Sequence, residues 1–232
     1  EEAIECNQFP RDTNLATIVV LPKPGHQLDH CSAYRPISLI NTELKIFAKV
    51  LARRLEPVIM SLIHPDQCGF MPTRSTRHCI RRLYSAMAVT QSRPGLRALF
   101  LLDFEKAFDS IDWEYLDGLL HRLGFGDYYR RCIGALYRGA TAQVRVNGHL
   151  SDPFPIGRGT RQGCPLSPML FALAIEPLAY WIRCDAQVRG WEIQGGGGKT
   201  ELHYTPTTSF YICHIFRTQG PEFSKSLVFS KK

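Results

Sequence analysis

The chain has 232 residues, 44% of them apolar and 21% charged, which is typical of a globular protein with one large or two small domains and unlike a disordered chain. No uninterrupted apolar stretch approaches the ~18–20 residues of a membrane span, so no transmembrane segment is predicted. The formal net charge of +7 favours a polyanionic partner such as nucleic acid.

The first ninety residues predict two strands followed by two helices. Leu15–Leu21 is a compact apolar run rich in β-branched residues, and Arg35–Asn41 is a second short strand. Asn41 or Thr42 caps a helix whose apolar residues keep a spacing of three and four through Leu62. A further helix is predicted from Arg74 to about Val89.

The next ninety residues predict a strand, two helices, a hairpin and a third helix. The strand covers residues 97–103, and the helices Trp113–Leu123 and Asp127–Arg138 each stop at a glycine. An Asn-Gly pair, the strongest short hairpin signal, lies within the extended stretch Ala142–Arg158. The last helix runs from Pro165 to about Arg183.

The N-terminus and the cysteines indicate the setting of the chain. Its opening is acidic and lacks Met, so we expect no signal peptide and a fragment of a longer protein. The eight cysteines contain no C-x-x-C pair, which argues against a zinc knuckle or a disulfide framework. We interpret them as small hydrophobic residues of an intracellular protein, in the nucleus or the cytoplasm.

The positive charge is concentrated in one window. Between Arg35 and Arg82 nine Lys and Arg residues stand against three acids. Such a region suits nucleic acid, although a solvated helix face explains charge runs at least as often.

A carboxylate stands at the end of a predicted buried strand. Asp103 follows the apolar run Leu99–Leu102, and Phe108 comes five residues later. Because a carboxylate in this position is costly to desolvate, it is expected to bind a metal or to cap the following helix. Asp109 and Asp112 are interpreted as structural residues that cap the helix at Trp113.

Three sequence blocks in order resemble one family, the reverse transcriptases of non-LTR retrotransposons, or long interspersed elements. The first block comprises Tyr34–Asn41, Lys45–Lys49 and Asp66–Phe70. The second is Leu-Asp-Phe-Glu-Lys-Ala-Phe-Asp at 102–109, and the third begins Gly-Thr-Arg-Gln-Gly-Cys-Pro-Leu-Ser-Pro and covers 159–171.

The resemblance covers roughly residues 15–190 and implies an α+β fold, the right-hand polymerase fold of reverse transcriptases with fingers, an incomplete palm and no thumb. Residues 1–96 would form the fingers with basic helices, and residues 97–190 a partial palm. Residues 191–232 are a divergent tail, expected to be poorly ordered.

In this family the palm uses two metal ions to transfer a nucleotide, which implies Mg²⁺ as the cofactor. Asp103 would be the catalytic carboxylate that bridges both metals, assisted by the backbone carbonyl of Phe104. Phe108 matches the aromatic residue that excludes a ribose 2′-hydroxyl. Plain core packing is the alternative for Phe108, and both roles can hold at once.

The resemblance also implies nucleotide-binding residues. Arg35 and Lys45 match positions that contact the incoming triphosphate, for which Arg offers bidentate geometry. A solvent-facing Lys45 is the alternative. Gln162 and Gly163 match the start of the loop and helix that line the nucleotide and template pocket, and Gly163 would let the backbone approach a base or sugar closely. A simple turn at the start of a helix is the alternative.

The expected partners are an RNA template, a DNA primer and deoxynucleoside triphosphates. We assign phosphate contacts with the template to four arginines, which supply affinity and no sequence readout. These are Arg74, Arg77, Arg81 and Arg82.

One block of the family is missing. A Tyr-Ala-Asp-Asp hairpin should follow the Gln162 helix, but no Asp follows Asp185, and Thr205–Thr208 reads Thr-Pro-Thr-Thr. Codons for Tyr-Ala-Asp-Asp read one nucleotide late encode Thr-Pro-Thr-Thr. We therefore expect a frameshift between about Gly195 and Tyr204 and a tail translated out of frame.

The sequence thus indicates a reverse transcriptase fragment whose metal site is incomplete. One alternative is a non-catalytic nucleic-acid-binding remnant that relies on its basic fingers. The other is an inert pseudogene product that neither folds stably nor binds.

Overall fold

A computed structural model describes residues 2–91, 97–102, 104, 106–185, 191–193, 200–204 and 212–217. The chain forms two compact units. The first consists of residues 1–62 and 105–174, and the second of residues 63–104 and 175–232.

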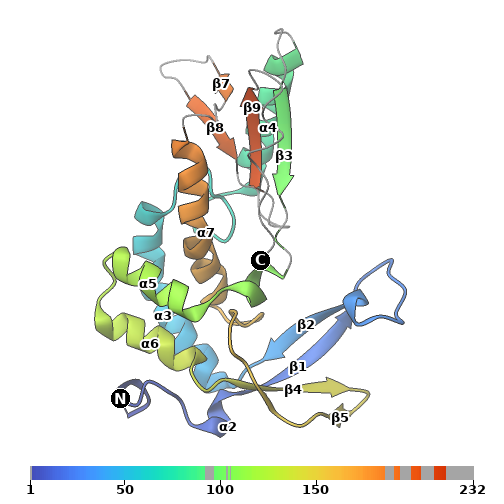
Figure 1. Cartoon of the computed structure of the whole chain (residues 1–232), viewed down its shortest axis with the longest axis vertical. Helices are drawn as coiled ribbons and strands as arrows, with labels where there is room; N and C mark the ends of the chain where they lie inside the picture. The colour runs from blue at the N-terminus through green and yellow to red at the C-terminus, as the bar shows by residue number, and fades with distance from the viewer. Residues whose placement is uncertain are drawn as a thin grey trace. The chain divides into compact units, whose positions relative to one another are not determined.

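Helices and strands follow one another in short runs along the chain (Figure 1). The helices are α1 (Glu2–Glu5), α2 (Arg11–Asn14), η1 (Cys31–Ala33), α3 (Thr42–Leu62), α4 (Thr76–Gln91), η2 (Ala107–Ser110), α5 (Trp113–Arg122), α6 (Asp127–Tyr137) and α7 (Ser167–Cys184). The strands are β1 (Leu15–Pro22), β2 (Tyr34–Leu39), β3 (Arg97–Leu102), β4 (Thr141–Val146), β5 (His149–Leu150), β6 (Phe154–Pro155), β7 (Trp191–Ile193), β8 (Thr200–Tyr204) and β9 (Ile212–Arg217). The mixture confirms the α+β class predicted from the sequence.

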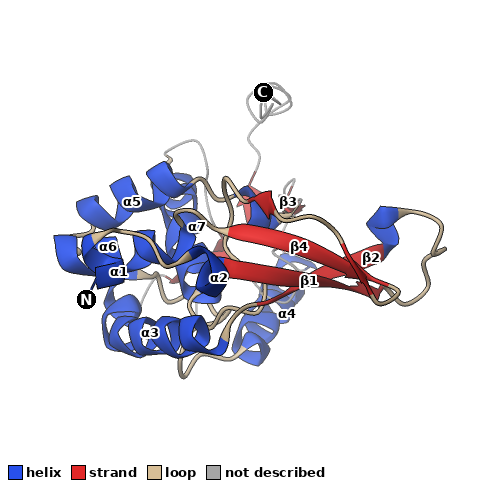
Figure 2. Cartoon of the chain, turned by 90° about the horizontal axis from the view of Figure 1, so that it is seen from below, coloured by secondary structure: helices blue, strands red, loops and turns tan. Residues whose placement is uncertain are grey.

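The first unit contains a sheet in the order β2-β1-β4-β5, with β6 paired to β4. β1 is antiparallel to β2 and parallel to β4, where Ala16 lies opposite Ala142. Strands β1, β2 and β4 extend together away from the helices, as Figures 1 and 2 show.

The core of the first unit lies among α3, α5, α6 and the start of α7. Helices α3, α5 and α6 gather at one end of the sheet (Figure 2). Tyr129 of α6 donates a hydrogen bond to the carbonyl oxygen of Leu51 in α3 at 2.9 Å. The fully buried aliphatic side chains that fill the core are Leu44, Leu55, Ile59, Leu116, Leu120, Leu166, Leu170 and Leu173.

Local signals place several element ends where they were predicted. Asn41 caps α3, since its Oδ1 accepts a hydrogen bond from the Glu43 amide at 3.1 Å. Asp112 caps α5 through the Tyr115 amide at 2.9 Å. Asn147 and Gly148 form the hairpin turn with φ of +50° and +82°, the conformation that a tight hairpin demands.

The second unit contains a sheet in the order β3-β9-β8-β7. β3 and β9 are antiparallel, and Leu102 at the end of β3 lies opposite Ile212 at the start of β9. β8 and β9 are also antiparallel, with Tyr204 opposite Cys213. The end of β3, the end of β8 and the start of β9 therefore lie at one edge of this sheet.

A loop before α4 is tied to that helix. Cys68 and Cys79 form a disulfide and are buried with Leu83 packed against them. The prediction that the cysteines are unpaired is thus wrong for these two, because the first turn of α4 returns to the loop, a tertiary approach that sequence spacing does not reveal. Among the described cysteines Cys6, Cys31, Cys132, Cys164 and Cys184 are free.

The boundaries of the two compact units differ from the boundaries predicted for the fingers, the palm and the tail. The assignment of fingers, palm and tail stays a prediction. Within residues 191–232 the structure describes the three strands β7, β8 and β9, and the remaining residues of the predicted tail lie outside the described part. No helix in the described ranges is long and apolar enough to cross a membrane.

Candidate functional site

Gln162 and Gly163 form a turn against strand β2 in the first unit. The Ser38 amide of β2 donates a hydrogen bond to the Gln162 carbonyl oxygen at 3.1 Å. Gly163 adopts a φ of +105°, and a Cβ atom there would lie 3.0 Å from the Ser38 carbonyl oxygen. The backbone at Gly163 therefore comes close to β2, and its positive φ favours glycine there. The expected approach of this backbone to a base or sugar stays a prediction.

Phe108 is held by the segment that leads into this turn. Its carbonyl oxygen accepts a hydrogen bond from the Thr160 amide at 2.7 Å, and the Gly159 amide donates to the Ile111 carbonyl oxygen at 2.7 Å. The Phe108 ring lies 5.3 Å from the ring of Phe171. The half-buried ring thus has the core contact that we expected as one of its two roles.

Asp109 has a different role from the predicted helix cap. Together with Gln162 it lines a cavity of about 220 Å³, and the Gln162 side chain donates a hydrogen bond to its carboxylate. Loss of water at the cavity wall raises the pKa of Asp109, while the Gln162 hydrogen bond and the charge of Lys106 oppose that rise. The sequence offered no signal for this contact, because it joins residues far apart in the chain.

Arg161 anchors the same turn from within the core. The residue is 9% exposed, and its guanidinium donates to Asn14, at 2.6 Å to Oδ1 and 3.2 Å to the carbonyl oxygen. The Ser167 hydroxyl donates to the Arg161 carbonyl oxygen at 2.9 Å. Burial lowers the pKa of Arg161, which reflects the cost of placing a cation among neutral partners.

The two remaining nucleotide-binding candidates of the first unit lie on its surface. Arg35 is an exposed residue of β2 and lies opposite Leu21 of β1. Lys45 is exposed in the first turn of α3. Neither is among the residues that line the cavity beside Gln162.

The metal-binding candidates belong to the second unit. Asp103 lies outside the described residues, and Phe104 is half-buried after the end of β3. The edge where β3 ends is also where β8 ends and β9 begins.

The four arginines assigned to the RNA template differ in their surroundings. The Arg74 guanidinium donates to the carbonyl oxygens of Ile63, His64 and Gln67 at 2.6 to 3.1 Å and so holds the loop before α4. Arg77 and Arg81 are exposed on α4. Arg82 lies on the same helix, and its side chain is outside the described part.

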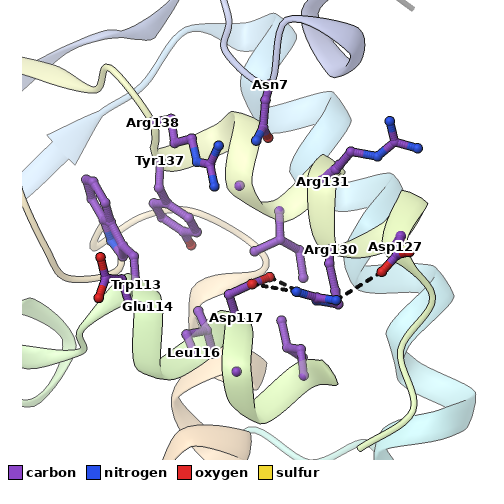
Figure 3. Close-up of a pocket in the computed structure, with 14 residues that line it drawn as sticks. Asn7, Trp113, Glu114, Leu116, Asp117, Asp127, Arg130, Arg131, Tyr137 and Arg138 are labelled. Atoms are coloured by element: carbon purple, nitrogen blue, oxygen red, sulfur yellow. Dashed lines mark hydrogen bonds and ion pairs between the residues drawn. The ribbon is translucent and has the colours of Figure 1, made fainter. Parts of the chain in front are cut away.

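A larger cavity, of about 820 Å³, lies between α5 and α6 and contains none of the predicted residues (Figure 3). Arg130 lies in it between two carboxylates, bonded to Asp117 at 3.0 and 2.5 Å and to Asp127 at 3.0 Å. Three acidic and three basic side chains line it, so its charge is balanced and gives no preference for an anion or a cation.

The donor set does not fit the two-metal site that the resemblance implies. Two hard divalent ions need several carboxylates. Asp103 is a single carboxylate, and the sequence contains no Asp after Asp185. Within the described ranges, no three His, Cys, Asp or Glu side chains converge.

Comparisons with known proteins bear on the family. The transposon TX1 uncharacterized 149 kDa protein of Xenopus laevis is 38% identical over 183 residues, which are 78% of this chain and 14% of that protein. The probable RNA-directed DNA polymerase from transposon BS of Drosophila melanogaster is 29% identical, over 71% of this chain and 18% of its own length. The Pol polyprotein of the R2 element of Popillia japonica is also 29% identical, over 68% of this chain and 22% of its own length.

The chain thus spans less than a quarter of each of these relatives. Among solved structures, apo telomerase from Candida tropicalis, truncated from its C-terminal domain, has the same fold, with a TM-score of 0.56 and 12% identity over 90% of this chain and 44% of that one. The profile of the reverse transcriptase (RNA-dependent DNA polymerase) family matches residues 21–204. This chain therefore belongs to the reverse transcriptase family.

Proposed function

We propose that this chain is the fingers and incomplete palm of a retrotransposon RNA-directed DNA polymerase and that it does not polymerise DNA. The observation that carries the proposal is the sequence Thr-Pro-Thr-Thr at 205–208, where the family resemblance calls for Tyr-Ala-Asp-Asp. One carboxylate, Asp103, remains of the metal-binding set. Losses of residues that act as a unit are severe and non-additive, so residual activity should be negligible.

The topology of the second sheet supports this proposal. Asp103 directly follows β3, and residues 205–211 connect β8 to β9. Because β3 and β8 end at the edge where β9 begins, the connection that should bring two carboxylates toward Asp103 is the one that carries threonine and proline.

A frameshift explains the replacement. The family match ends at Tyr204, directly before Thr205. The encoding nucleotides test this explanation without any protein, since one alternative frame across codons 195–208 should read Tyr-Ala-Asp-Asp. A locus with no such frame would exclude a frameshift.

The same proposal assigns ligands to the first unit. Deoxynucleoside triphosphates would meet Gln162, Gly163 and Phe108, with Arg35 and Lys45 on their phosphates. The geometry of the Gln162 turn, fixed by β2 and by Arg161, supports a preformed pocket at this place. An RNA template and a DNA primer would be the polymeric partners, as the name of the family implies.

Primer extension on an RNA–DNA hybrid with Mg²⁺ tests the proposal. The purified chain should incorporate no labelled nucleotide above the level of Asp103→Asn. Incorporation by the wild type that Asp103→Asn abolishes would show a working enzyme and contradict the proposal.

A non-catalytic RNA-binding remnant is the second candidate, favoured by the exposed Arg77 and Arg81 on α4. Salt-dependent RNA binding without incorporation would support it. A purified chain that shows no cooperative melting and no RNA binding would instead be an inert pseudogene product.

A further inference from the structure

Cys68 and Cys79 form a buried pair where the chain enters α4. Cys68 is 7% exposed and lies in the loop before α4, which covers residues 63–75. Cys79 is 1% exposed and lies in the first turn of the helix. Leu83, one turn further along α4, packs against the pair. Because the disulfide joins the loop to the helix, making or breaking it changes how firmly the two are tied together.

The loop has other anchors that do not depend on the disulfide. The Arg74 guanidinium donates at 2.6 to 3.1 Å to three carbonyl oxygens, those of Ile63, His64 and Gln67. The His64 amide donates to Oε1 of Glu176 at 3.3 Å. These contacts hold the backbone next to Cys68 whether or not the bond between the two sulfur atoms is present.

The reduced form of the pair also fits its surroundings. The Sγ atom of Cys79 lies 3.9 Å from the carbonyl oxygen of Asp66. A disulfide sulfur has no proton to donate, whereas the thiol formed by reduction can donate to this oxygen. The apolar contact with Leu83 suits a free cysteine, which packs as a small hydrophobic residue. Cys79 therefore has a suitable neighbour in both redox forms.

We infer that Cys68 and Cys79 form a reversible redox lock on the loop before α4. In the oxidised form the disulfide ties the loop to the helix, and in the reduced form only the noncovalent contacts remain, so the loop opens more often. A disulfide that served only as a staple would be needed for folding, but Arg74 and Glu176 hold this loop without it. The lock goes beyond the proposed function and does not depend on it.

Oxidised glutathione, a small disulfide, is the oxidant in this exchange. The thiolate of Cys68, the more exposed of the two, attacks one glutathione sulfur, forms a mixed disulfide and releases one glutathione thiolate. The thiolate of Cys79 then attacks the Cys68 sulfur and releases the second glutathione. The two protons of the protein thiols end on the two glutathione molecules. Reduction by two molecules of glutathione is the same exchange in reverse.

Equilibration of the full chain with mixtures of reduced and oxidised glutathione tests the lock. Alkylation and mass spectrometry of the peptides that contain Cys68 and Cys79 measure the ratio of disulfide to dithiol. We expect complete and reversible conversion, with cooperative melting in both forms. Amide hydrogen exchange over residues 63–75 should be faster in the reduced form. Cys68→Ser should exchange as the reduced wild type does, in either mixture.

The contribution of Arg74 is measured at one fixed glutathione ratio. Because Arg74 holds the loop next to Cys68, it raises the effective concentration of one thiol at the other. Arg74→Met should lower the ratio of disulfide to dithiol about tenfold or more, the factor expected for one hydrogen bond to a charged group. Arg53→Met removes an exposed arginine of α3 and should leave the ratio unchanged.

Arg74→Lys provides a second measurement if Arg74→Met does not fold. Lysine keeps the charge but lacks the planar fork that reaches several carbonyl oxygens at once, so the ratio should fall between those of the wild type and Arg74→Met. A ratio equal to that of the wild type in every folded variant would overturn the role of Arg74 in the lock.

Four results would overturn the lock itself. The two cysteines could stay unjoined at every glutathione ratio, or the bond could resist the most reducing mixture. Reduction could abolish cooperative melting, which would make the disulfide a staple. A covalent dimer on a nonreducing gel, with Cys68 of one chain joined to Cys79 of a second, would assign the bond to two chains. None of these results bears on whether the chain polymerises DNA, so the proposed function is tested separately.

Discussion

Gly159 and Asp109 meet backbone to backbone. A Cβ atom at Gly159 would lie 2.8 Å from the Asp109 Cα and 2.9 Å from its carbonyl oxygen. The hydrogen bonds on either side of this contact join Gly159 to Ile111 and Thr160 to Phe108. The position of Phe108, the residue proposed to discriminate sugars, therefore depends on a glycine fifty-one residues further along the chain.

Gly159→Ala should destabilise the chain through both the backbone conformation and this contact. A φ of +89° disfavours any residue with a Cβ by about 1–2 kcal/mol, and the clash with Asp109 adds to that. Gly148→Ala is the matched control, because its φ is +82° and nothing lies within 4 Å of its added Cβ. Urea unfolding should show a larger decrease in the free energy of unfolding for Gly159→Ala than for Gly148→Ala. Equal decreases would contradict the close contact with Asp109.

The sequence predicted the elements that local signals define. The Asn-Gly turn at 147–148 and the Asp112 cap of α5 depend on residues within a few positions of one another. Only the family resemblance predicted that Phe108 and Gln162 lie near each other. Composition and periodicity do not predict contacts between residues so far apart in the chain.

The contacts that the sequence did not reveal are long-range. β1 pairs in parallel with β4, and Asn14 bonds to Arg161, 147 residues away. Arg74 was expected on RNA because it lies in a basic run, yet its guanidinium holds three carbonyl oxygens of its own loop. Charge alone cannot distinguish a cation that binds a ligand from one that satisfies the backbone.

The bond between Arg161 and Asn14 should appear as coupling in a double-mutant cycle. Both side chains are buried, and a hydrogen bond to a charged group contributes about 1.5–3 kcal/mol, so Arg161→Met and Asn14→Ala should couple by that amount in unfolding free energy. The matched cycle uses Arg158→Met with the same Asn14→Ala, because Arg158 and Arg161 both line the cavity beside Gln162 but Arg158 is exposed. Coupling below about 0.5 kcal/mol for the Arg161 pair would exclude the bond.

Asp109→Asn should change how stability depends on pH. Partial loss of solvent raises the pKa of Asp109 in the folded chain, although its side chain is still exposed, so the folded state binds the proton more tightly than the unfolded state. The wild type therefore loses stability as the pH rises from about 4, the unfolded value, through the folded pKa. Relative to the wild type, Asp109→Asn should gain stability across that window, and a difference that is flat with pH would refute the partial loss of solvent at this carboxylate.

Asp117→Asn should show the opposite dependence. The hydrogen bonds from Arg130 hold the pKa of Asp117 below its usual range, so its carboxylate stabilises the fold above the unfolded pKa. That stabilisation is lost as the pH falls through the lowered folded value. Asp117→Asn should therefore be less stable than the wild type at pH 7, and the difference should shrink below about pH 4. Chemical unfolding at pH 7, 5, 4 and 3 measures both variants against the same wild type. If the pair with Arg130 forms, protonation of Asp117 removes its contribution, and the difference in unfolding free energy between wild type and Asp117→Asn shrinks on acidification. A difference that grows on acidification would mean that the pair does not form.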